Sequence, residues 1–316
     1  MAIFKDYLEN KSPLILHGAL GTEMESLGYD ISGKLWSAKY LLEKPEVIQK
    51  IHETYVAAGA DLITTSSYQA TLPGLIDAGL TKEEAEQIIA LTVQLAKNAR
   101  DKVWATLDDS EKANRPYPLI SGDVGPYAAY LANGSEYTGD YGQITIEALK
   151  EFHRPRIQIL LDHGVDLLAL ETIPNYLEAQ ALIELLAEEF PEAEAYISFT
   201  VQEPGTISDG TSLDEIAQLV GQSDQILALG INCSSPLLYN QALAILKNAG
   251  KALITYPNSG EVYDGSTQTW KPKDKDALTL VEHSKDWHTQ FGVKILGGCC
   301  RTRPNDIKAL YAEFRT

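Results

Sequence analysis

Short runs of apolar and β-branched residues recur along the chain and alternate with longer segments whose apolar residues repeat at helical spacing. The short runs have no regularly polar face, as expected of strands that are covered on both sides. They lie at 14–18, 61–66, 118–125, 165–172, 195–200, 226–233, 252–258 and 293–300. Helical periodicity is clearest at 46–59, 82–100, 176–190 and 237–250.

Eight strand–helix units in 316 residues predict an α/β fold, namely a (β/α)8 TIM barrel in a single domain, 1–316. An open, doubly wound parallel sheet is the alternative for this pattern, but no G-x-G-x-x-G follows the first strand. Pro155 lies inside the helical pattern of 147–164, where we expect it to break or kink the helix.

Longer loops are predicted at 102–117, 125–142, 202–212 and 258–274. The last three follow strands, so a barrel places them on its C-terminal face, where such enzymes build their sites. The second loop is rich in Tyr and Gly, which indicates a lid or pocket wall, although a flexible surface loop has the same composition.

Composition excludes several classes of partner. With 26 Lys and Arg against 44 Asp and Glu, the net charge of −18 disfavours nucleic acids and anionic membrane surfaces. No segment approaches the roughly 20 apolar residues of a membrane-spanning helix, and the N-terminus does not have the pattern of a secretion signal. Three cysteines suit a reducing compartment. We therefore expect a cytoplasmic monomer with small-molecule partners.

The cysteines occur in similar contexts. Cys233 ends one apolar run, and Cys299 and Cys300 end another. In a barrel both strands end on the same rim, so the three thiols should converge. Converging thiolates repel one another unless a cation holds them, and sulfur ligands favour zinc among the common cellular metals. Gly297 and Gly298 would allow the tight turn that brings two successive cysteines to one ion.

Other interpretations of these cysteines remain open at this point. Cys233 could be a small buried hydrophobe beside a coincidental pair, or the adjacent cysteines could form a vicinal redox pair. A zinc ion with three protein ligands keeps an open position, which is typical of a catalytic site. With three thiolates that ion carries a net negative charge, so it suits holding a substrate thiol as a nucleophile better than activating water.

Other polar residues also stand at strand ends. Glu171 would be costly there unless it meets a cation such as a substrate ammonium, or accepts hydrogen bonds from its own turn. Asp123 fits a helix cap as well as a functional role, and Asn232 fits the orientation of the turn at Cys233. His17 and Tyr68 also end strands. The remaining histidines fall in or beside helical patterns and are interpreted as surface or packing residues: His52, His153, His163, His283 and His288.

Taken together, the motifs resemble the homocysteine S-methyltransferase family, and within it the members that use S-methylmethionine. The resemblance covers residues 14–312, and the combination of GINC with GGCC is its most specific part. It is carried by 18-GALGTEMESLGYD-30, 67-SYQAT-71, 121-SGDVGPYAAYLANGSEYTGDY-141, 171-ETIPN-175, 230-GINC-233, 255-TYPNSGE-261 and 297-GGCCRTRP-304.

The resemblance implies Zn²⁺-dependent transfer of a methyl group from a sulfonium donor to the thiol of L-homocysteine, giving methionine. It implies that Cys233, Cys299 and Cys300 bind the metal, that Glu171 holds the homocysteine amine, and that Tyr68 lies beside the metal. Asn232 is a further candidate for substrate binding. His17 stands where the family usually has an Asp that helps hold the amine. Either Glu171 takes more of this role, or a neutral imidazole accepts the hydrogen bond instead.

Two other functions are compatible with the sequence. Betaine could replace the sulfonium as donor, or the protein could be a non-catalytic sensor that uses zinc and thiols. S-adenosylmethionine is a further sulfonium candidate. The donor cation would suit aromatic faces, for which Trp36, Tyr127, Tyr130 and Tyr256 are candidates, although ordinary packing also explains each of them.

Overall fold

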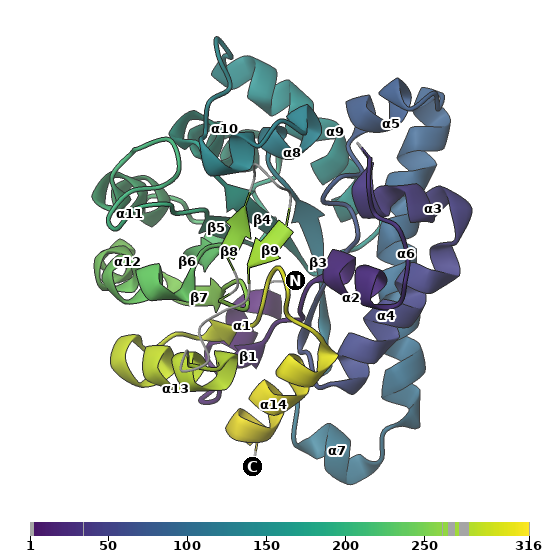
Figure 1. Cartoon of the computed structure of the whole chain (residues 1–316), viewed down its shortest axis with the longest axis vertical. Coiled ribbons are helices and arrows are strands. Elements are labelled where there is room, and N and C mark those ends of the chain that lie inside the picture. The colour runs from purple at the N-terminus through teal and green to yellow at the C-terminus, as the bar shows by residue number, and fades with distance from the viewer. Residues whose placement is uncertain (1–2, 34, 261, 265–268, 272–277, 316) are drawn as a thin grey trace.

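Eight parallel strands occupy the centre of the molecule, and helices surround them (Figure 1). This computed structural model describes residues 3–33, 35–260, 262–264, 269–271 and 278–315. The strands follow the order β1-β10-β7-β6-β5-β4-β3-β2, and a bridge between Leu16 and Leu62 joins the two ends of the sheet. The sheet is therefore a nearly closed (β/α)8 barrel, as predicted, and the open-sheet alternative is wrong.

All eight predicted strands are present, and each is shorter than the apolar run that predicted it. They are β1 (Leu14–Ile15), β2 (Leu62–Thr64), β3 (Leu119–Val124), β4 (Leu167–Ile173), β5 (Ala195–Phe199), β6 (Ile226–Asn232), β7 (Ala252–Tyr256) and β10 (Ile295–Leu296). A small antiparallel hairpin of β8 (Val262–Asp264) and β9 (Thr269–Lys271) lies in the predicted loop 258–274, part of which is outside the described residues.

The helices cover the outside of the barrel. They are α1 (Ile3–Leu8), α2 (Leu20–Ser26), α3 (Lys39–Glu43), α4 (Pro45–Ala57), α5 (Leu72–Asp77), α6 (Lys82–Thr106), α7 (Asp109–Ala113), α8 (Tyr127–Leu131), α9 (Ile146–Asp162), α10 (Tyr176–Glu189), α11 (Leu213–Gly221), α12 (Tyr239–Leu246), α13 (Leu280–Phe291) and α14 (Pro304–Arg315). Capping boxes begin α6, α7, α11 and α13, where a Ser, Thr or Asp is followed three residues later by Glu.

Two of these helices extend beyond the limits expected from the sequence. The predicted loop 102–117 is largely helical, because α6 extends to Thr106 and α7 follows it. The helix α9 continues through Pro155 instead of ending there. Proline removes the donor for the carbonyl of Glu151, but Glu151 is exposed, so water can satisfy that carbonyl. The buried face of α9, with residues such as Ile157 and Leu160, offsets the remaining cost.

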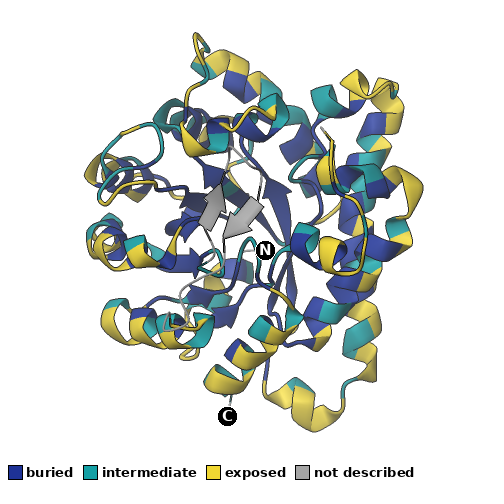
Figure 2. Cartoon of the chain, in the orientation of Figure 1, coloured by how far each residue is buried: buried dark blue, intermediate teal, exposed yellow. Residues whose placement is uncertain are grey.

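Alternate strand residues fill the inside of the barrel, and the other residues pack against the helices. The inner cluster includes Leu62, Leu119 and Leu167 near the strand starts. Phe4 of α1 belongs to this cluster and is fully buried, and its backbone N–H donates to Glu194 at 2.8 Å. Helix α1 thus packs against the N-terminal end of the barrel interior. Buried residues concentrate at the centre and on the inner sides of the helices (Figure 2).

Candidate functional site

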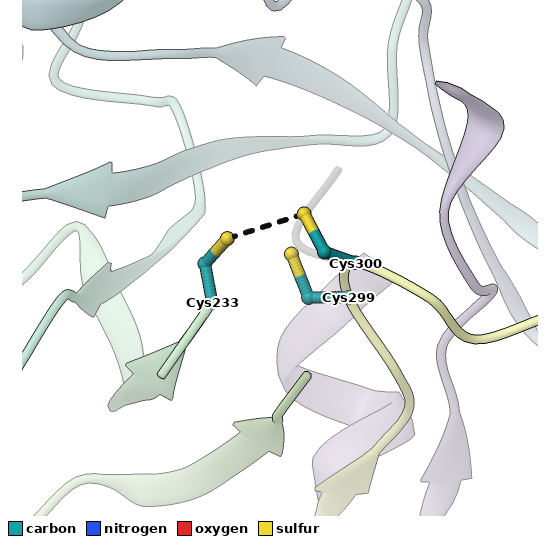
Figure 3. Close-up of side chains that lie close together, drawn as sticks. All are labelled: Cys233, Cys299 and Cys300. Atoms are coloured by element: carbon teal, nitrogen blue, oxygen red, sulfur yellow. Dashed lines mark hydrogen bonds between the residues drawn. The ribbon is translucent and has the colours of Figure 1, made fainter. Parts of the chain in front are cut away.

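The three cysteine sulfurs meet at the C-terminal rim of the barrel, as predicted. Cys233 follows β6, and Cys299 and Cys300 follow β10; their side chains point toward one another (Figure 3). All three sulfurs lie within 4.8 Å of one another, and the Sγ atoms of Cys233 and Cys300 are 3.5 Å apart. This convergence means that Cys233 is not merely a buried hydrophobe beside an unrelated pair.

The backbone holds the cysteines in place from both sides. The N–H of Cys233 donates to the carbonyl of Tyr256 at 3.3 Å, and the N–H of Cys299 donates to the carbonyl of Pro257 at 2.8 Å. Both glycines before the cysteine pair are needed for close packing, because a Cβ on Gly297 would lie 2.7 Å from Leu16 and one on Gly298 would lie 2.4 Å from Thr302. The glycines therefore provide space, while Cys233 itself adopts a left-handed φ of 48°.

The thiols lie in the wall of a large cavity, with a volume of about 1520 Å³. Residues of loop 125–142, including Glu136 and Tyr137, form part of its wall, so the pocket-wall interpretation of this loop is confirmed. The sequence did not identify these two residues individually, nor the rim formed by segment 28–33. Among the described residues that line the cavity, the ionisable ones are carboxylates, cysteines, tyrosines and His17, and none is Lys or Arg.

Glu171, on β4, faces this cavity and is half-buried. The Tyr256 hydroxyl donates to its Oε2 at 3.2 Å, and the same hydroxyl shares a hydrogen bond with Ser198. Burial raises the pKa of Glu171 to about 7; the Tyr256 hydrogen bond opposes this rise and the Cys300 thiol adds to it. A positive group beside Glu171 would remove the cost of its charge.

His17 also lines the cavity and has one nitrogen available to accept a hydrogen bond. Its Nδ1 contacts the carbonyl of Gly18, which can only accept, so Nδ1 carries the proton. The buried Nε2 then bears a lone pair and has no hydrogen-bond partner in the described part of the chain. Burial lowers the pKa of His17 to about 4, which keeps the ring neutral at neutral pH. This geometry agrees with the expectation from the sequence that a neutral His17 imidazole can accept a hydrogen bond.

Tyr68 lines the same cavity after β2. Its ring lies against Gly125, where a Cβ would come within 2.6 Å of the ring. Burial raises the pKa of Tyr68 well above its usual range, and the charges of Glu136 and Cys233 raise it further. The hydroxyl of Tyr68 therefore remains protonated beside the thiols.

Comparisons with known proteins match this arrangement. The family model described as homocysteine S-methyltransferase matches residues 14–314. The homocysteine S-methyltransferase YbgG of Bacillus subtilis is 45% identical over 305 residues, covering 96% of this chain and 95% of its own length. The chain belongs to the homocysteine S-methyltransferase family.

Solved structures of the homocysteine methyltransferase MmuM from Escherichia coli share the fold. The metallated form is 41% identical, with a TM-score of 0.85 and coverage of 97% of this chain and 98% of that one. The apo form aligns with a lower TM-score of 0.75, at 36% identity and 97% coverage of both chains. As a member of this family the protein is a methyltransferase that forms methionine from homocysteine, and the non-catalytic sensor alternative is wrong.

The structure shows what the side chains of Asn232 and Asp123, two polar residues at strand ends, contact. Asn232 accepts from the N–H of Thr172 at 3.0 Å and donates to its hydroxyl at 2.8 Å, which holds the residue after Glu171 in a left-handed conformation. A direct contact between Asn232 and substrate stays a prediction. Asp123 does not cap the next helix, because Pro126 occupies the N-cap of α8; its side chain lines the cavity instead.

The aromatic candidates divide into two groups. Trp36 and Tyr256 line the cavity. Tyr127 and Tyr130 are absent from its described lining and pack on Phe152, with ring centroids 5.0 and 5.6 Å away, so packing explains both. Tyr137, which had not been a candidate, supplies an aromatic side chain to the cavity wall.

A buried polar network behind Tyr68 was not predicted from the sequence. Arg156 of α9 is 1% exposed and donates to the carbonyls of Ser67, at 3.3 Å, and Tyr68, at 3.1 Å, and also to that of Gly125. His153, one turn earlier, contacts Arg156 at 3.2 Å and Glu178 of α10 at 2.8 Å. Arg156 thus fixes the two loops that place Tyr68. The sequence did not indicate that Arg156 is buried, because a charged residue next to a helical proline is not a recognisable signal of burial.

We predict that Arg156→Met lowers the free energy of unfolding by about 3 kcal/mol, because it leaves buried carbonyls without donors. Urea denaturation measures this loss. Arg154→Met is the matched control on the same helix: Arg154 is partly exposed and pairs with Glu189 at 2.8 Å. It should cost less than about 1 kcal/mol. Equal effects of the two substitutions would contradict the proposed anchoring of the loops.

Proposed function

We propose that this methyltransferase takes the methyl group from S-methylmethionine and holds Zn²⁺ with Cys233, Cys299 and Cys300. The observation that carries the proposal is the convergence of three sulfurs in a cavity whose described lining contains no Lys or Arg. The substrates are then small molecules, L-homocysteine and a sulfonium cation.

The cysteines fit a zinc ion. Zinc–sulfur bonds of about 2.3 Å in a tetrahedron require sulfurs about 3.8 Å apart. The described sulfurs all lie within 4.8 Å of one another, and one pair is at 3.5 Å.

When bound, the zinc would keep the homocysteine sulfur deprotonated at neutral pH, so that its thiolate can attack the donor methyl carbon. The carbon–sulfur bond of the sulfonium breaks, and the donor leaves as a neutral thioether with the electron pair. Glu171 would hold the homocysteine ammonium, and the bare Nε2 of His17 would accept a second hydrogen bond from it. Tyr68 would form one wall of the homocysteine site. Asn232 would hold the backbone after Glu171 in its conformation through its hydrogen bonds to Thr172.

The charge of the cavity favours a cationic donor. S-methylmethionine carries an ammonium, a sulfonium and a carboxylate, and thus one net positive charge. Carboxylates line the described cavity without any compensating Lys or Arg. Trp36, Tyr137 and Tyr256 offer aromatic faces to the sulfonium, each of which stabilises a cation by about 0.5 to 2 kcal/mol.

We further propose that residues 1–316 act as one catalytic domain, as a monomer in the cytoplasm. Three free cysteines support a reducing compartment, where they would remain available to the metal. No described helix is both long and apolar enough to cross a lipid bilayer. The net charge of −18 supports the absence of nucleic acid partners.

The purified protein should contain about one zinc per chain, because three ligands with one open position describe a single catalytic site. Changing Cys233, Cys299 or Cys300 to Ala should abolish both zinc content and methyl transfer, as measured by elemental analysis and methionine formation. Zinc added back to a chelator-treated wild-type sample should restore activity. Full activity of that sample before zinc is added would contradict the proposal.

Glu171→Gln should reduce kcat/KM for homocysteine by about 10- to 150-fold, because the amide keeps the shape but loses the charge that holds the ammonium. Zinc content should not change. Glu25→Gln is the matched control, since Glu25 is an exposed carboxylate at the cavity rim. Unchanged kinetics in the Glu171 variant would show that this carboxylate acts only within its own turn.

Methionine formation with each donor in turn tests the choice of methyl donor. S-methylmethionine should be the fastest, S-adenosylmethionine slower, and glycine betaine and methyltetrahydrofolate inactive. The acidic cavity disfavours the anionic folate, and betaine carries no net positive charge. Faster turnover with betaine at saturating homocysteine would make betaine the donor and leave the metal site unaffected.

A further inference from the structure

Asp123 is a buried carboxylate on the cavity wall. It is 4% exposed and lies on β3 among the residues that line the cavity. Its Oδ1 atom has no hydrogen-bond partner among the described residues. Buried polar atoms in native proteins are nearly always hydrogen-bonded, so an oxygen of this kind indicates a position for an external donor.

Arg156 does not supply that donor. Its guanidinium attracts Asp123 through space, but its NH1 and NH2 groups donate to loop carbonyls. Its Nε has no partner among the described residues, and no described hydrogen bond or ion pair joins Arg156 to Asp123. The described residues of the cavity wall include no Lys or Arg. A donor in direct contact with Asp123 would therefore come from a ligand in the cavity.

Asp123 and Glu171 face the barrel interior from neighbouring strands. Asp123 pairs in register with Ala169, and Glu171 follows Ala169 by two residues, so the alternation of the strands directs both carboxylates inward. Burial raises the pKa of Asp123 well above its usual range, and the charge of Glu171 raises it further. The two carboxylates thus destabilise each other, and the Arg156 guanidinium offsets only part of this cost.

We propose that Asp123 is a second binding residue for the α-ammonium group of homocysteine, which it holds together with Glu171. An ammonium has three N–H donors, so it can bond to both carboxylates and offset their repulsion. The inference rests on the proposed role of Glu171. In this chain the resemblance places His17 where the family usually has Asp, so Asp123 on β3 would supply the second acid from another strand.

The test compares two thiols in Asp123→Asn. L-homocysteine carries the ammonium, whereas 4-mercaptobutanoate has the same thiol and carboxylate without it. The variant should lower kcat/KM for homocysteine by about 10- to 100-fold. For the amine-free thiol, kcat/KM as methyl acceptor and the inhibition constant as competitive inhibitor should each change by less than about threefold. This compound makes no contact that depends on the lost charge. Zinc content should be that of the wild type.

Asp30→Asn is the matched control. Asp30 also lines the cavity, but it is exposed and pairs with Lys39 at 3.4 Å. Its loss should leave the preference for homocysteine unchanged. Asp123→Ser, which removes the charge without adding volume, serves as a second variant if Asp123→Asn folds poorly.

Each other outcome has a distinct meaning. Unchanged homocysteine kinetics in folded Asp123→Asn would overturn the role of Asp123 while leaving the zinc site and Glu171 intact. Equal losses for both thiols would also overturn it, because they would show a role in shaping the barrel rather than in binding the ammonium. Absence of methyl transfer by the wild-type enzyme from every sulfonium donor would instead contradict the proposed function.

Discussion

Closure of the barrel is the constraint on which the site depends. The bridge between Leu16 and Leu62 joins the first and last strands of the sheet, and all strands then end on one rim. Closure brings His17, after β1, to the same cavity as Tyr68, after β2. Cys233 meets the adjacent pair Cys299 and Cys300 because β7 alone lies between β6 and β10 in the sheet. The register Ile231↔Thr255 and Leu296↔Thr255 sets both strand ends at the same height.

The rim is held in conformations that most residues avoid. Thr172, Cys233 and Arg301 have φ values of 64°, 48° and 66°, and each follows or adjoins a residue of the proposed metal or substrate site. Left-handed conformations cost about 1 kcal/mol or more for residues other than glycine. Hydrogen bonds between strand ends, such as those between Asn232 of β6 and Thr172 of β4, hold these positions. These strained backbone conformations thus lower the stability of the fold, and they orient the side chains of the proposed metal and substrate sites.

Much of this arrangement could be predicted from the sequence, because strand order and strand ends follow from apolar runs. The meeting of the three thiols and the placement of Glu171, Tyr68 and His17 on one cavity required only that the strands form a barrel. The role of Arg156 could not be predicted, since a charged residue beside a helical proline gives no sign of burial. Tyr137 was missed because loop geometry, rather than periodicity, brings it to the wall. Gly297 and Gly298 were expected to permit a turn, and the structure shows that they permit close packing.

The cavity's described lining, which holds carboxylates but no Lys or Arg, also bears on how the reaction ends. Methyl transfer from the proposed donor, S-methylmethionine, converts a sulfonium with a net positive charge into a neutral thioether, and both resulting amino acids are zwitterions without net charge. The cavity carboxylates that attract the cationic donor therefore attract the neutral thioether product much more weakly. With this donor, the cavity would therefore favour a new donor molecule over the spent one at the same position, which would promote product release.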